Sequence, residues 1–156
     1  MADQSPKKRI AIFGSTGSIG TQALDVIRAN PHLFEVEILT AQTNDELLVK
    51  QALEFKPNAV VIGDEARYQK VKDALDKTLT KVFVGEKALE EVADFDSYDM
   101  MLAGIVGFAG LKPTMKAVEK GKPVGLANKE TLVVAGDLVM QKAIEKRTPI
   151  IPVDSE

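Results

Sequence analysis

The feature that most constrains the fold is a glycine-rich turn at residues 14–20, Gly-Ser-Thr-Gly-Ser-Ile-Gly. The residues before it, 9–13, form an apolar run of the kind that becomes a buried strand. The residues after it, 21–29, repeat apolar side chains at helical spacing. We therefore predict a strand, a tight turn and a helix, in that order.

Each glycine of this turn has a physical use. Gly14 lets the chain turn sharply off the strand, Gly17 lets the backbone approach a ligand, and Gly20 lets the helix pack closely on the sheet. A helix start offers backbone N–H groups and the positive end of the helix dipole, so the expected ligand is a phosphate or pyrophosphate. The spacing G-x-x-G-x-x-G differs from the G-x-G-x-x-G dinucleotide fingerprint, and a purely structural turn is the alternative.

Strand and helix patterns alternate along the rest of the chain. The expected strands are 34–39, 58–62, 81–84, 98–103, 123–127 and 149–153, and the expected helices are 44–55, 64–75, 87–92, 113–120 and 131–146. Strands joined through helices by short connections form parallel sheets with right-handed crossovers. We predict an α/β fold, a doubly wound, Rossmann-like parallel sheet with helices on both faces, in one domain spanning residues 1–156.

Composition excludes several classes of protein. The 156 residues carry a net charge of −3 and only 5% aromatic residues, which gives no basis for binding nucleic acid or an anionic membrane. There is no cysteine, so disulfides, thiolate metal sites and cysteine nucleophiles are ruled out. No apolar run reaches the length of a membrane span, and residues 1–8 lack the apolar segment of a secretory signal. The cytoplasm is the expected location.

Ligands of open parallel sheets bind outside the carboxyl ends of the strands, which selects five loops. They are residues 14–20, 41–44, 104–110, 128–130 and 154–156. At 41–44 the sequence is Ala-Gln-Thr-Asn, with no acid to bind a ribose 2′-hydroxyl. This neutral tip favours NADP over NAD, although it also lacks the Arg or Lys that holds a 2′-phosphate.

Two acids follow the last expected strand. Residues two apart on a strand share a face, so Asp154 and Glu156 could both turn toward one cation, with Ser155 between them. Two carboxylates suit Mg²⁺ or Mn²⁺. The alternative is that both acids are simply solvated.

The segment Asn128-Lys129-Glu130 also has two interpretations. At a helix start, Asn128 can serve as an N-cap and Glu130 as an acid that the helix dipole favours, with Lys129 solvated. The functional interpretation places their side chains at the ligand crevice.

Four segments together resemble the 1-deoxy-D-xylulose 5-phosphate reductoisomerase family. They are residues 14–20, Ala-Gly-Ile-Val-Gly at 103–107, Leu-Ala-Asn-Lys-Glu at 126–130, and Pro-Val-Asp-Ser-Glu at 152–156. The resemblance covers the chain from Lys8 onward. It implies conversion of 1-deoxy-D-xylulose 5-phosphate to 2-C-methyl-D-erythritol 4-phosphate in the non-mevalonate route to isoprenoids, by a rearrangement followed by NADPH-dependent reduction, with a divalent cation holding the substrate's oxygens.

The resemblance also implies residue roles. It assigns cofactor binding to the turn, the second-strand tip and the helix start, namely to Thr16, Gly17, Ser18, Ile19, Gln42, Asn44, Asn128 and Glu130. It assigns catalysis to Lys129 and Glu156, substrate contacts to Lys129, Ser155 and Glu156, and the metal to Asp154 and Glu156.

The chain departs from the family pattern in two places. Where many members have Gly-Lys-Asn or Gly-Ser-Asn, this sequence has Gln42-Thr43-Asn44. The family's chain also continues past Pro-Val-Asp-Ser-Glu into a catalytic region and forms homodimers, so we expect an NADPH-binding part that binds cofactor without turning over the sugar phosphate.

Two rival functions share the glycine turn. An aldehyde or semialdehyde dehydrogenase with the same turn would need a cysteine nucleophile, which is absent. A non-catalytic module that senses NADP(H) would leave the segments at 128–130 and 154–156 without a purpose.

Overall fold

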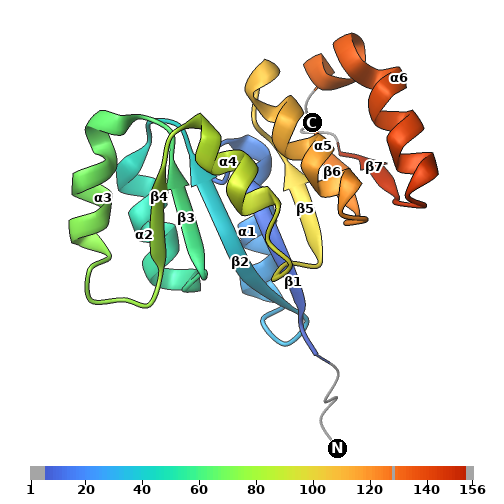
Figure 1. Ribbon diagram of the computed structural model, residues 1–156. Coiled ribbons are helices and arrows are strands. Elements are labelled where there is room, and N and C mark those ends of the chain that lie inside the picture. Colours follow the sequence, from blue (N-terminus) through green and yellow to red (C-terminus); the bar gives the residue numbers. More distant parts are fainter. Residues whose placement is uncertain (1–5, 128, 154–156) are drawn as a thin grey trace, which may run out of the picture.

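The computed structural model describes residues 6–127 and 129–153, without the side chains of residues 129–135 (Figure 1). Seven strands form one sheet in which every neighbouring pair is parallel. The strands are β1 (Lys8–Phe13), β2 (Phe34–Ala41), β3 (Ala59–Ile62), β4 (Lys81–Val84), β5 (Met100–Ala103), β6 (Val124–Leu126) and β7 (Ile150–Pro152). The helices are α1 (Ser18–Ala29), α2 (Asp45–Phe55), α3 (Tyr68–Ala74), α4 (Glu86–Ala93), α5 (Leu111–Glu119) and α6 (Lys129–Glu145), with 3₁₀ turns η1 (Glu65–Arg67) and η2 (Phe108–Gly110).

The strand order is β4-β3-β2-β1-β5-β6-β7, which confirms the doubly wound α/β prediction. The chain begins in the middle at β1, adds β2 to β4 on one side, and returns past β1 to add β5 to β7 on the other. The order therefore reverses between β1 and β5, where open parallel sheets bind their ligands. Because all pairs are parallel, the carboxyl ends of β1, β5, β6 and β7 lie at the same edge of the sheet.

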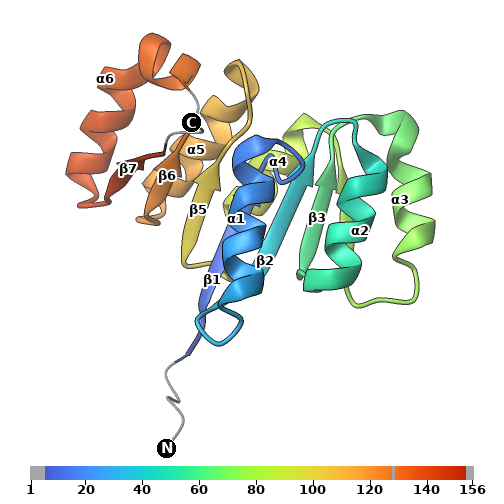
Figure 2. The ribbon, with the colours of Figure 1, turned by 180° about the vertical axis from the view of Figure 1, so that it is seen from behind.

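Helices cover both faces of the sheet. Figures 1 and 2 show α1, α2 and α3 on one face, α4 and α5 on the opposite face, and α6 beside α5. Alternate residues of β1 point to opposite faces. Phe13 belongs to a core under α4 and α5, and Ile12 belongs to a core under α1 and α2.

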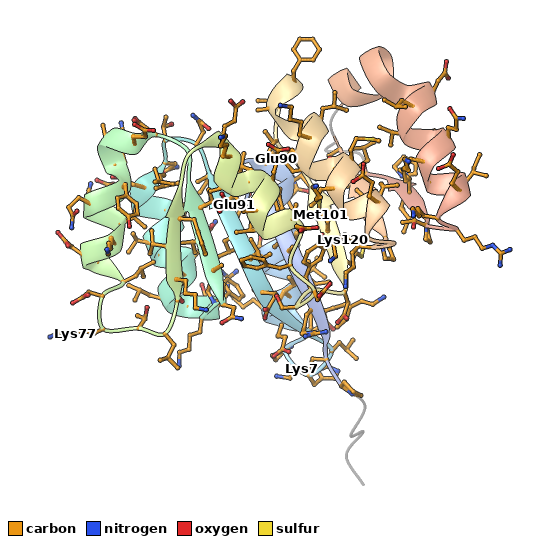
Figure 3. All side chains as sticks on the ribbon, in the orientation of Figure 1. Lys7, Lys77, Glu90, Glu91, Met101 and Lys120 are labelled. Carbon is orange, nitrogen blue, oxygen red and sulfur yellow. The ribbon has the colours of Figure 1, made fainter. Side chains whose placement is uncertain are left out.

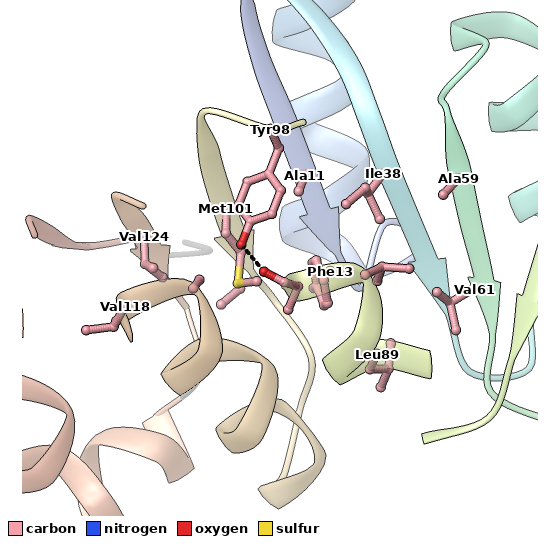
Figure 4. Packing of buried hydrophobic residues seen from close by; sticks show 14 of the residues in the cluster. Ala11, Phe13, Ile38, Ala59, Val61, Leu89, Tyr98, Met101, Val118 and Val124 are labelled. Atoms are coloured by element: carbon pink, nitrogen blue, oxygen red, sulfur yellow. Dashed lines mark hydrogen bonds between the residues drawn. The ribbon is translucent and has the colours of Figure 1, made fainter. Parts of the chain in front are cut away.

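Tyr98 anchors the core on the α4 and α5 side (Figure 4). Its side chain is fully buried, and its hydroxyl donates a hydrogen bond to the Ala93 carbonyl oxygen at 2.5 Å. Burial raises the pKa of this phenol, helped by the nearby charges of Asp94 and Asp96. The expected strand 98–103 begins only at Met100, because Tyr98 turns into the core ahead of it.

Local hydrogen bonds explain where two helices start. Asn44 caps α2 as predicted, with its Oδ1 accepting from the Leu47 amide at 3.2 Å. The expected helix 64–75 is instead the 3₁₀ turn η1 followed by α3. Asp64 caps η1, with its Oδ1 accepting from the Ala66 amide at 3.0 Å.

Charged side chains lie mainly on the outside of the molecule. Figure 3 shows Lys7 and Lys77 pointing outward near the amino ends of the strands, whereas Met101 lies inside. Within the described part of the chain, no helix has the length and apolar character needed to span a bilayer.

Candidate functional site

The glycine turn packs tightly against its surroundings at the β1–β5 reversal. Gly14 has φ +88°, and an added Cβ there would lie 2.9 Å from the carbonyl carbon and oxygen of Gly104, which follows β5. A Cβ on Gly20 would lie 2.4 Å from the Gly14 carbonyl oxygen and 2.5 Å from the Ser15 Cα. The positive φ and the two close approaches explain why glycine stands at these positions.

The turn leads directly into the start of α1. Gly17 is the N-cap residue, and no side chain makes a capping hydrogen bond there. Gly17 and Ser18 are both exposed, so a ligand can reach the first turn of the helix. Uncapped N–H groups at the positive end of a twelve-residue helix are a suitable environment for an anion.

A pocket of about 180 Å³ opens beside this turn. It is lined by Gly14, Thr16, Gly17, Thr40, Ala41, Gln42, Gly63, Leu89, Gly104, Ile105 and Val106. These residues come from the turns after β1 and β5, the ends of β2 and β3, and helix α4. The pocket is thus assembled from the carboxyl ends of neighbouring strands, as the open-sheet rule requires.

The sequence-predicted cofactor residues occupy different positions around this pocket. Thr16, Gly17 and Gln42 line it. Ser18 lies exposed at the start of α1, and Ile19 packs against the core under α1. Asn44 is exposed beyond the β2 tip, where its side chain caps α2.

The second-strand tip holds a charged cluster that sequence reasoning missed. Asp45 has a side chain only 5% exposed, and its two oxygens lie 3.3 Å from Arg67 Nη1 and 3.2 Å from Lys70 Nζ. Burial opposes ionisation of Asp45, but Lys70, the Glu46 amide and Arg67 together hold its pKa below the ordinary value. Arg67 also donates from Nε to Asp64 Oδ2 at 3.2 Å.

A hydrogen-bonded network beneath the turn was also missed. Gln51 of α2 and Thr40 of β2 bond to Ser15, and all three side chains are buried. Gln51 stands three positions after Leu48, on the apolar side of α2, and a polar residue at such a position indicates a buried hydrogen bond. Spacing along the chain does not show that Ser15 is the partner.

The remaining predicted residues follow β6 and β7. Ala127 and Val153 continue these strands, with amides that donate to Ala103 O and Leu126 O, both at 3.0 Å. Lys129 and Glu130 are the first residues of α6. Asn128, Asp154, Ser155 and Glu156 lie outside the described residues, so their predicted roles stay predictions.

No group of three or more acidic, histidine or cysteine side chains suited to a metal occurs among the side chains that the structure describes. The predicted metal site therefore depends on Asp154 and Glu156 and stays a prediction.

A larger hollow of about 670 Å³ lies at the opposite edge of the sheet. It is lined by the start of β2, the end of α2 and the loop before β4. This is the amino-terminal edge, away from the glycine turn and the strand-order reversal.

Known proteins resemble this chain at the level of family, sequence and structure. The family model described as 1-deoxy-D-xylulose 5-phosphate reductoisomerase matches residues 10–136. The 1-deoxy-D-xylulose 5-phosphate reductoisomerase of Bacteroides fragilis is 55% identical over 150 residues, which cover 96% of this chain and 39% of the relative. The protein of that name from Clostridium perfringens is 48% identical over 151 residues, with the same two coverages.

Solved structures give the same picture. The reductoisomerase of Zymomonas mobilis in complex with NADPH superposes with a TM-score of 0.92 at 40% identity, covering 97% of this chain and 40% of that one. A DOX-P reductoisomerase with NADPH, fosmidomycin and magnesium gives 0.88 at 35% identity, covering 93% of this chain and 36% of that one.

Homoserine dehydrogenase of Staphylococcus aureus, at 17% identity and a TM-score of 0.58, shares the fold alone. This chain spans about 39% of the length of the curated relatives that it matches. From the match over residues 10–136, the chain belongs to the 1-deoxy-D-xylulose 5-phosphate reductoisomerase family.

Proposed function

We propose that this chain is the NADPH-binding part of a 1-deoxy-D-xylulose 5-phosphate reductoisomerase. The whole protein would convert that sugar phosphate to 2-C-methyl-D-erythritol 4-phosphate by rearrangement and NADPH-dependent reduction. The observation that carries the proposal is the uncapped start of α1, which opens beside the pocket at the β1–β5 reversal. The NADPH complex of the Zymomonas mobilis relative supports it.

The residues at the turn fit a dinucleotide. Thr16 and Gly17 line the pocket, and Gly17, Ser18 and Ile19 lie at the start of α1, so the backbone there would hold the pyrophosphate. Gln42 and Asn44 at the β2 tip would contact the adenosine half.

The charges at the β2 tip suit NADPH better than NADH. An NAD-type site presents a carboxylate to the ribose hydroxyls. Here Asp45 is buried and already paired with Arg67 and Lys70, so it does not present a free carboxylate. Gln42 and Asn44, which are exposed, are neutral.

The other predicted roles belong to residues 128–130 and 154–156. Asn128 and Glu130 would contact the nicotinamide half, and Lys129 and Ser155 would contact substrate. Lys129 and Glu156 would act in catalysis, and Asp154 and Glu156 would hold Mg²⁺ or Mn²⁺. The bound cofactor would supply a hydride. The sugar phosphate substrate, a homodimer of the longer protein and a cytoplasmic location are part of the same proposal.

Titration of the chain with NADPH and with NADH tests this function. The chain has no tryptophan, so the cofactor's own fluorescence can be followed without energy transfer from that residue. We expect NADPH to bind more tightly than NADH, and Mn²⁺ to alter the NADPH titration. A chain that binds NADPH but ignores the metal would favour a sensing module, and a chain that binds neither nucleotide would contradict the proposal.

Gly17→Ala provides a local test. An added Cβ at Gly17 meets only Gly14 O, at an ordinary 3.6 Å, so the chain should fold normally. The new methyl would nevertheless stand at the start of α1, and we expect NADPH to bind about tenfold more weakly. Gly136→Ala on α6, where a Cβ meets nothing within 4 Å, is the matched control and should leave binding unchanged.

A further inference from the structure

The strongest unexplained feature near the site is a buried amide beneath the glycine turn. Gln51 lies on α2 and is only 5% exposed. Its neighbours on the buried side of α2 are the apolar residues Leu48 and Ala52. A polar side chain in such a position needs hydrogen-bond partners, since burial without them is costly.

Both ends of the Gln51 amide bond to one residue of the turn. Gln51 Nε2 donates to the Ser15 carbonyl oxygen at 2.9 Å, and Ser15 Oγ donates to Gln51 Oε1 at 2.8 Å. The Ser15 amide donates to Thr40 O at 2.8 Å. The backbone and side chain of Ser15 are therefore fixed on the side of the turn that faces α2 and β2.

This arrangement determines where the next amide points. The described peptide bonds are all trans, and in a trans peptide the C=O of one residue and the N–H of the next point in opposite directions. Since the Ser15 C=O points toward Gln51, the Thr16 N–H points away from α2. Thr16 itself lines the pocket beside the start of α1.

We propose that Gln51 is a positioning residue for the dinucleotide: by holding the Ser15 carbonyl, it aims the Thr16 N–H at the cofactor's phosphates. The inference rests on the proposed NADPH-binding function and adds to it a residue behind the turn. Gln51 touches no ligand, and it acts through Ser15. An apolar side chain at position 51 would leave the Ser15 carbonyl without its donor, and the peptide would be free to rotate.

Gln51→Glu gives a test that distinguishes positioning from mere support of the fold. While the introduced carboxyl is protonated, it can still donate to Ser15 O and accept from Ser15 Oγ. Once it is ionised, it has no proton to donate and repels the carbonyl oxygen. We therefore expect this variant to bind NADP⁺ within about threefold of the parent at low pH and about tenfold more weakly once the carboxyl ionises. Burial raises the pKa of a carboxyl, so the change should fall above the usual range for glutamate.

The comparison is made as the ratio of variant to parent dissociation constants at each pH. Effects of pH that variant and parent share cancel in this ratio. They include those of the cofactor's own 2′-phosphate and those of the charged residues in the groove between α1 and α2, which are Asp25, Arg28, Lys50 and Glu54. NADP⁺ is used because the reduced form decomposes in acid.

Two further variants complete the experiment. Gln51→Met keeps the length of the side chain without its hydrogen bonds, and it should bind NADP⁺ about tenfold more weakly at every pH. Leu48→Ala, a fully buried residue of the same helix that does not bond to the turn, should lower stability but leave NADP⁺ affinity unchanged in the folded protein.

The positioning role would be overturned if the ratio of dissociation constants for Gln51→Glu did not change with pH. It would also be overturned if folded Gln51→Met bound NADP⁺ as tightly as the parent. If the parent itself does not bind NADP⁺, the proposed function fails and this inference fails with it. Binding by the parent together with unaffected variants would leave the function standing and remove only the inference.

Discussion

Gly14 and Gly104, ninety positions apart, bring the turns after β1 and β5 into direct backbone contact. A Cβ on Gly14 would lie 2.9 Å from the Gly104 carbonyl carbon, and one on Gly104 would lie 3.3 Å from the Phe13 carbonyl oxygen. The Gly104 amide also donates to Phe13 O at 2.8 Å. The two turns are thus in contact beside the pocket, with no room for a side chain on Gly14 and little on Gly104.

Gly14→Ala should harm both stability and cofactor binding. The substitution combines a positive φ of +88° with a steric clash against Gly104, and we expect a loss of about 2–4 kcal/mol in the free energy of unfolding. Gly85→Ala is the matched control, because Gly85 has φ +92° but nothing within 4 Å of an added Cβ. Its backbone, with φ +92° and ψ 172°, is itself unfavourable for alanine, so Gly85→Ala should cost about 1–3 kcal/mol, and Gly14→Ala should lose more because it adds the clash with Gly104.

Urea unfolding and NADPH titration measure both effects of Gly14→Ala. Equal losses of stability in the two variants would show that the contact with Gly104 contributes nothing. We expect NADPH binding to weaken in Gly14→Ala alone.

Tyr98→Phe tests the anchor of the core on the α4 and α5 side. The variant removes the hydroxyl that bonds to Ala93 O and leaves that carbonyl without this donor in a buried environment. We expect a loss of about 1–2 kcal/mol in unfolding free energy, with NADPH affinity unchanged, because Tyr98 does not line the pocket. A stability equal to that of the parent would mean that another donor replaces the hydroxyl.

The charge cluster at the β2 tip predicts a pH dependence of stability. The pKa of Asp45 is held below its ordinary value in the folded chain by Lys70, the Glu46 amide and Arg67, so ionised Asp45 stabilises the fold above the pKa of the unfolded chain. This contribution is lost as the pH falls through the folded-state pKa. Replacing Lys70 by Met removes the closest cation from Asp45 Oδ2 and raises the pKa of folded Asp45 toward its unfolded-state value. Acidification should therefore cost this variant less unfolding free energy than it costs the parent. Lys142→Met, which removes a partner of the half-exposed Glu145, is the control. Its loss of unfolding free energy on acidification should equal that of the parent.

Sequence reasoning succeeded where the determinants are local. The glycine turn at residues 14–20, the cap at Asn44 and the alternation of strands and helices follow from neighbouring residues, and the parallel sheet follows from that alternation. It missed the bonds from Gln51 to Ser15 and from Arg67 to Asp45, because these join segments 36 and 22 positions apart. No periodicity along the chain reports which side chains meet after the strands pair.

The last prediction concerns Gln42, whose side chain lies directly over Gly63. An added Cβ on Gly63 would lie 2.1 Å from Gln42 Oε1, and Gly63 does not have a positive φ. Since Gln42 is exposed and flexible, Gly63→Ala should displace its amide at little cost in stability. If Gln42 contacts the adenosine half of the cofactor, NADPH should bind about three- to tenfold more weakly in Gly63→Ala and in Gln42→Ala alike.

The double variant decides between two causes of that weakening. Once the Gln42 side chain is removed, nothing remains for the new methyl to displace, so Gly63→Ala should have no further effect on NADPH affinity in the Gln42→Ala background. Neighbouring residues that act through one contact show this non-additivity, whereas independent effects add. Fully additive losses would mean that the methyl added at position 63 obstructs the pocket directly, since Gly63 also lines it, and would remove the support for Gln42 as a cofactor residue.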